Sequence, residues 1–209
     1  MRRRTFDFLA TCIGAVLTVV LLVAGGLLLW GASFTSGSVH DQLAAQKIYF
    51  PPAAAFAHPQ VGSEITPSMI PSVSQYAGQQ LLTGQQAQAY ANDFIAVHLN
   101  EIGNGKTYAQ LSSAAMALPP GSAAYTAAEA QVQTVFQGTT LRGLLLEAYG
   151  FGTMGSIAFI AAICALCLAG VMLLLTLFGF LHYRKVDEKT EILGKTVSLP
   201  VNNKEPVLV

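Results

Sequence analysis

The side chains in this 209-residue sequence that could perform chemistry are a few histidines and carboxylates, scattered along the chain. His98 and Glu101 are three residues apart, so they would share one face of a helix. If a distant histidine, His40 or His58, joined them, the set would have the composition of a two-histidine-one-carboxylate iron site, and spacing neither shows nor excludes this. We assign no catalytic, metal-binding or cofactor-binding residue, and keep a metal-dependent enzyme using His98, Glu101 and a distant histidine as the alternative function. The remaining candidates are Asp41, beside His40, and Asp93.

The three cysteines all fall inside strongly apolar stretches. Cys164 and Cys167 have the spacing of redox and zinc motifs, but there is no second pair, and thiolates are disfavoured on a lipid-embedded helix. We therefore expect Cys164 and Cys167 to be small apolar packing residues; Cys12 lies inside the other apolar stretch. The segment between the apolar stretches has no cysteine, no Gly-x-Ser-x-Gly motif and no phosphate-binding loop, so neither a disulfide framework nor covalent catalysis is indicated.

Two apolar stretches organise the rest of the chain. Residues 156–181 contain no charged residue, and residues 8–30 have the same character. A helix of about 20 apolar residues crosses the roughly 30 Å hydrocarbon core of a bilayer. A soluble helix would instead carry a polar face. We therefore predict two transmembrane helices, at residues 8–34 and 151–182, with the lipid bilayer as a partner.

Basic residues flank the predicted spans on one side only. Arginines at positions 2–4 precede the first span, and Arg184 and Lys185 follow the second. The positive-inside rule then places both termini in the cytoplasm and residues 35–150 outside the plasma membrane. Aromatic residues typical of the membrane interface lie on the outer side of both spans: Trp30, Phe34, Tyr149 and Phe151.

The two ends of the chain, residues 1–7 and 183–209, are predicted to be cytoplasmic. The first apolar run is longer than the core of a secretory signal and no clear Ala-x-Ala site follows it, so we expect an uncleaved anchor. The carboxyl-terminal tail mixes charges of both signs with Pro and Asn, which is typical of a disordered segment.

Small residues recur at four-residue spacing in both spans. They are Ala10, Gly14 and Thr18 in the first, and Ala161, Ala165 and Ala169 in the second. Such faces let membrane helices approach closely, so they predict either packing within the hairpin or a homodimer seam. Neither span has an ionisable residue at its centre, where a transporter or proton channel would place one.

The segment between the spans is mildly acidic and helical in pattern. Residues 35–150 hold three basic and six acidic side chains, and without a clustered basic face we exclude nucleic-acid binding. Helices are predicted for residues 83–102, for 108–118 after Thr107, and from Ser122 onward. We also expect a short helix capped by Ser36 or Ser38 and ended by Pro51 and Pro52, an irregular stretch to about Gly78, and a helix break at residues 138–140.

The stretches at residues 23–52, 76–102 (with GKTYA at 105–109) and 133–152 resemble a family of small two-span membrane proteins from actinobacteria. The resemblance covers about residues 6 to 184 and implies a two-span fold without an assigned biochemical function; some members carry the label of an aromatic ring-opening dioxygenase. Taken together, the sequence predicts an all-α integral membrane protein, a two-helix transmembrane hairpin with a small helical extracytoplasmic cap. We expect a non-catalytic cell-envelope scaffold or accessory subunit that binds a membrane or cell-wall partner, another membrane protein or a second copy of itself.

Overall fold

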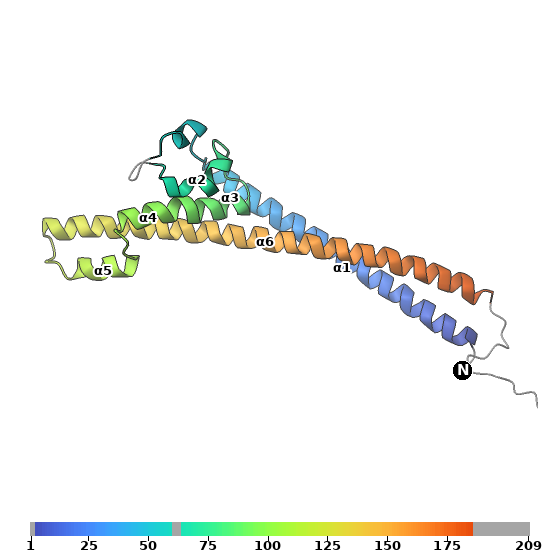
Figure 1. The fold of residues 1–209 in the computed structure, drawn as a ribbon. Helices are drawn as coiled ribbons and strands as arrows, with labels where there is room; N and C mark the ends of the chain where they lie inside the picture. Colours follow the sequence, from blue (N-terminus) through green and yellow to red (C-terminus); the bar gives the residue numbers. More distant parts are fainter. Residues whose placement is uncertain (1–2, 60–63, 186–209) are drawn as a thin grey trace, which may run out of the picture. The chain divides into compact units, whose positions relative to one another are not determined.

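The computed structural model describes residues 3–59 and 64–185, and these are almost entirely helical (Figure 1). The two long helices are α1 (Arg3–Gln46) and α6 (Ala123–Tyr183). The shorter elements between them are, in chain order, η1 (Ala53–Phe56), η2 (Pro67–Met69), α2 (Ile70–Val73), η3 (Ser74–Tyr76), α3 (Gly84–Ala89), the π-helix η4 (Tyr90–Ile95), α4 (Ala96–Ile102) and α5 (Tyr108–Met116). The prediction of an all-α chain with two long apolar helices and a small helical region between them is confirmed.

Both long helices are unbroken where the sequence predicted interruptions. No new helix begins at Ser36 or Ser38, because α1 runs on for 44 residues to Gln46. The predicted break at residues 138–140 is also wrong, because α6 continues through it for 61 residues in all. Gly138 serves packing rather than helix termination, since a Cβ there would lie 2.5 Å from Cδ2 of Leu99.

The chain forms two compact units. One is the helix pair, residues 3–26 of α1 with residues 163–185 of α6. Its contact face on α1 recurs at positions 7, 11, 14, 18, 21 and 25, a heptad spacing that favours a shallow left-handed crossing. The helices approach closely at Gly14, where a Cβ would lie 2.6 Å from Oγ1 of Thr176.

The predicted small-residue faces contribute only in part to this contact. Thr18 and Ala169 are buried, with 4% and 1% of their surface exposed. Ala10 and Ala161, by contrast, are exposed. The three cysteines are also exposed, so they lie outside the contact between the two helices. The contacting face follows a seven-residue repeat, which carries Ala10 and Cys12 away from the partner helix.

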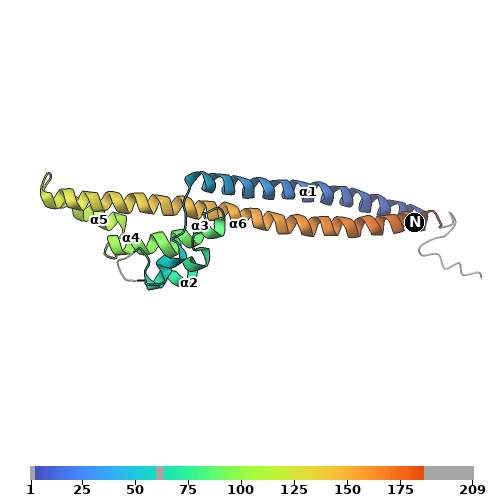
Figure 2. The same ribbon diagram turned by 90° about the horizontal axis from the view of Figure 1, so that it is seen from above.

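The other unit is the helical domain, residues 27–162. Within it, α3, η4 and α4 run alongside α6 (Figure 1; Figure 2). Its main core joins α1 to this layer and to the irregular stretch: Val39, Leu43, Phe50, Ile65, Met69, Val73, Leu81, Ala87, Ala91, Ile95 and Leu145. A smaller core lies between α5 and α6: Leu111, Ala115, Val132 and Val135. The irregular stretch therefore packs on the domain through its large apolar residues.

The predicted helix at residues 83–102 is confirmed, with an unpredicted π-helix at its centre. It begins with a capping box, in which Gln86 N donates to Thr83 Oγ1 at 3.2 Å and Thr83 N donates to Gln86 Oε1 at 3.0 Å. It ends at Gly103, followed by the left-handed residues Asn104 and Gly105. The apolar spacing in this stretch fits α-helix throughout, so nothing in it signals the wider turn of η4.

Candidate binding groove

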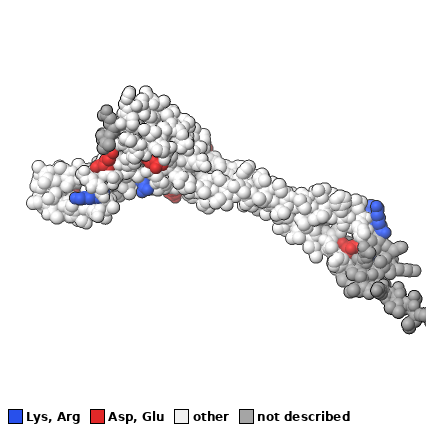
Figure 3. Space-filling model, viewed as in Figure 1, with Lys and Arg blue, Asp and Glu red and all other residues white. Residues whose placement is uncertain are grey.

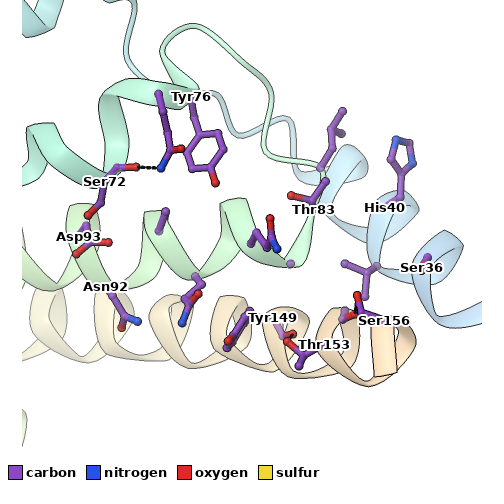
Figure 4. A pocket seen from close by; sticks show the side chains of 18 of the residues that line it. Ser36, His40, Ser72, Tyr76, Thr83, Asn92, Asp93, Tyr149, Thr153 and Ser156 are labelled. Atoms are coloured by element: carbon purple, nitrogen blue, oxygen red, sulfur yellow. Dashed lines mark hydrogen bonds between the residues drawn. The ribbon is translucent and has the colours of Figure 1, made fainter. Parts of the chain in front are cut away.

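A polar groove of about 950 Å³ runs along the helical domain (Figure 4). Its walls are the second half of α1, the segment of α2 and η3, the run of α3 and η4, and the middle of α6. The lining side chains that can form hydrogen bonds are Ser36, His40, Ser72, Gln75, Tyr76, Thr83, Gln85, Gln88, Asn92, Asp93, Tyr149, Thr153 and Ser156. The volume is in the range of small-molecule binding sites.

Two glycine contacts bring these walls together. A Cβ on Gly84 would lie 3.1 Å from both Ala148 O and Tyr149 Cα, so α3 meets the backbone of α6 directly. A Cβ on Gly155 would lie 3.3 Å from Oγ of Ser36, which places α1 against the same helix. These close approaches bring α1 and α3 against α6, and polar groups from the three helices converge on one groove.

The π-helix supplies Asn92 and Asp93 to the groove. Arg142 Nη2 on α6 donates to Asn92 Oδ1 at 2.8 Å and so fixes the orientation of this amide. A π-helix inserts an extra residue into a turn and changes which side chains face a given wall, and such insertions are frequent at functional sites.

The groove is lined by neutral polar groups with few charges. Lining side chains include the carboxylate of Asp93 and the imidazole of His40, and no Lys or Arg among the described residues takes part. On the face shown in Figure 3, the charged side chains of the helical domain are few and scattered.

Several lining side chains make no hydrogen bond with any described residue. Ser36, Gln85, Gln88 and Asp93 have none, so their donors and acceptors are available to a ligand. Gln75 Nε2 donates to Ser72 O at 2.9 Å, and the side-chain oxygen Oε1 of Gln75 stays free. Thr153 and Ser156, by contrast, donate to α6 carbonyls one turn earlier.

The histidine and carboxylate candidates are not brought into one site. His98 Nδ1 lies 2.9 Å from Phe94 O, and its ring packs edge-on against the Phe94 ring at 4.6 Å between centroids. His40 lies 3.2 Å from Asp41 instead. Across residues 3–59 and 64–185, no three His, Cys, Asp or Glu side chains are grouped to hold a metal ion. Of the candidates, only His40 and Asp93 line the groove.

The amides that dominate the groove were not singled out from the sequence. Gln85, Gln88 and Asn92 follow the three- and four-residue spacing of one helix face. That polar stripe, opposite the apolar face of the same helix, is the signal that could have indicated the site. The segment of Ser72 to Tyr76 offers no comparable pattern, since its place on the groove depends on tertiary packing.

The phenol of Tyr90, which packs against the core beside the groove, makes the stability of the domain depend on pH. Burial, together with the negative charge of Glu64, raises the pKa of the Tyr90 phenol above its usual value of 10.0. Its ring lies 5.3 Å from that of Phe50 and 4.7 Å from that of Phe94. The folded domain therefore holds the phenolic proton more tightly than the unfolded chain.

This difference predicts a stability loss at alkaline pH. The stabilisation is fully present below pH about 10 and is lost as the pH rises through the raised pKa of the folded state. The free energy of unfolding should therefore fall more steeply above pH 10 in the natural protein than in Tyr90→Phe. Denaturant titrations at a series of pH values measure this, and parallel curves for the two proteins would refute it.

No known protein family, curated protein or solved structure matches this sequence. The fold and the groove define the chain as an all-α protein with two long apolar helices and a helical domain that carries a polar groove. The resemblance to two-span actinobacterial membrane proteins stays a prediction.

Proposed function

We propose that this chain is an integral protein of the plasma membrane that crosses the bilayer twice, through α1 and α6. The observation that carries this is the exposure of their apolar surface. In the most apolar 18-residue windows of the two helices, only 17% and 11% of the residues are buried within the protein. Exposed apolar surface costs about 25 cal/mol per Å² in water, whereas lipid removes this cost.

The orientation proposed is the one with both termini in the cytoplasm. Arg4, Arg184 and Lys185 gather at one end of the helix pair, where Arg4 lies over the Tyr183 ring at 5.2 Å. On α1 in the helical domain, Trp30 and Phe34 stack at 5.8 Å and are 68% and 65% exposed. Cations favour the cytoplasmic side, and exposed aromatic rings favour the interface.

Within this topology we propose a non-catalytic role, as a scaffold or accessory subunit. The helical domain would present its groove to a component of the membrane or the cell wall. Support comes from the lining, because amides and hydroxyls bind by hydrogen bonding and do not titrate near neutral pH. A second copy of the chain or another membrane protein could then assemble on the exposed faces of α1 and α6.

Cysteine labelling in intact cells tests the topology. In a variant with Cys12, Cys164 and Cys167 replaced by serine, we introduce Ser113→Cys on α5 or Ser198→Cys in the tail. A membrane-impermeant thiol reagent should label the cysteine at position 113 and leave the one at 198 unlabelled until the cells are permeabilised.

Two controls make the result decisive. Detergent solubilisation should allow labelling at both positions, and alkaline carbonate should leave the protein in the membrane fraction. Labelling of position 198 alone in intact cells would reverse the orientation. Release of the protein by carbonate would contradict the two spans.

A further inference from the structure

The groove combines free donors and acceptors in a way that suits a ligand rich in hydroxyl groups. Gln85 and Gln88 each carry an amide that donates and accepts, and neither is hydrogen-bonded to a described residue. A sugar hydroxyl also donates and accepts, so one amide can bind two adjacent hydroxyls. The free hydroxyl of Ser36 and the carboxylate of Asp93 extend the same pattern to two other parts of the lining.

The charges of the groove disfavour an anionic ligand. The lining contains no cationic Lys or Arg side chain among the described residues. The nearby guanidinium of Arg142 is directed to Asn92 Oδ1 at 2.8 Å. The carboxylate of Asp93 would repel a phosphate or a carboxylate, but it accepts hydrogen bonds from neutral hydroxyls.

Two aromatic rings give the groove flat apolar surfaces. Tyr76 belongs to η3 and Tyr149 to α6, so they come from different walls (Figure 4). The C–H face of a pyranose ring packs on such a surface, while the phenol hydroxyls remain available for hydrogen bonds. A volume of about 950 Å³ accommodates more than one sugar ring.

We propose that the groove binds a neutral carbohydrate of two or three linked pyranose units. This inference rests on the proposed function, because it names the chemical class of the envelope component. Two sources share this chemistry: the head group of a neutral glycolipid and a soluble or wall-attached glycan. Ser36 lies six residues after Trp30 on α1, so in the proposed topology the groove opens close to the lipid head groups.

Binding is measured on the full chain reconstituted in phospholipid nanodiscs. One arm adds the neutral trisaccharides maltotriose, cellotriose and chitotriose to the solution and records saturation-transfer NMR. The other arm incorporates diglucosyl-diacylglycerol in the disc and records its protection of the groove from labelling, with Ser72→Cys as the reporter in the cysteine-free chain. Diacylglycerol without sugar is the matched lipid.

The test variant is Gln85→Leu with Gln88→Leu, and the control is Gln133→Leu with Gln137→Leu on exposed positions of α6 outside the groove. Removing two amides should weaken binding about tenfold or more, while the control should bind like the natural protein. Far-ultraviolet circular dichroism checks that both variants remain folded.

Each outcome decides the proposal. Binding of a trisaccharide that depends on the groove amides supports it with a soluble glycan as the source, and protection only by the glycolipid supports it with a head group as the source. Absence of both, equal binding by the two variants, or displacement of the sugar by inorganic phosphate or a neutral peptide overturns it. Since the cell-labelling result does not depend on any sugar, failure here leaves the two-span topology standing.

Discussion

Leu145→Ala should lower the free energy of unfolding of the helical domain by about 3 kcal/mol. Leu145 lies on α6 with 1% of its surface exposed, in the core that joins α1, the irregular stretch and the helix after Thr83. Its removal leaves a cavity among elements that contact one another through this core. Thermal unfolding in detergent, followed by circular dichroism, should show a midpoint lower by about 10 °C.

The neighbouring leucine provides the control. Leu144 lies beside Leu145 on α6 but is 56% exposed. Leu144→Ala should therefore change the thermal midpoint by no more than about a degree or two. Equal loss in the two variants would mean that α6 does not present the face seen here to the core. No loss in either would mean that the long helices alone determine the unfolding transition.

Much of the helical pattern could be predicted because it depends on local signals. Thr83 and Thr107 each precede a glutamine at the third helical position, and both form the capping boxes that this spacing favours. The two long apolar helices follow from composition, which needs no tertiary information. The membrane itself and the orientation remain predictions, because the residues of α1 and α6 show only which surfaces are exposed.

The parts that could not be predicted depend on contacts between distant segments. Gly138 looks like a helix stop in the sequence, but a side chain from α4, Leu99, occupies the space above it. Ser36 looks like a cap, yet α1 continues through it and places it on the groove. In both cases a residue with weak local preference takes its role from the packing around it.

The groove was missed for the same reason. Histidines and carboxylates are the side chains that signal chemistry in a sequence, whereas the lining is mostly amides and hydroxyls from four segments. Such residues are common on any surface, so only their convergence in space distinguishes them. The tail after residue 185, predicted to be disordered, lies outside the described residues.

Gly84→Val should separate α3 from α6 and disrupt the groove. A Cβ at this position already lies 3.1 Å from Ala148 O and Tyr149 Cα, and both atoms belong to a helix backbone that cannot rotate away. The two further methyl groups of valine therefore require α3 to move. Overpacking of this kind costs about 1–3 kcal/mol, so the thermal midpoint should fall by several degrees.

The control for this change is Gly143→Val, on α6 at a position where a Cβ meets nothing within 4 Å. Valine is no worse than glycine inside a helix, so this variant should unfold at the natural temperature or slightly above it. Comparing Gly84→Val with Leu145→Ala also separates stability from binding. Leu145→Ala removes apolar contacts without changing any groove side chain, whereas Gly84→Val moves the helix that carries Gln85 and Gln88. At a temperature where both remain folded, only Gly84→Val should weaken trisaccharide binding. Equal weakening would mean that the groove responds to general loosening of the domain rather than to the contact between Gly84 and α6.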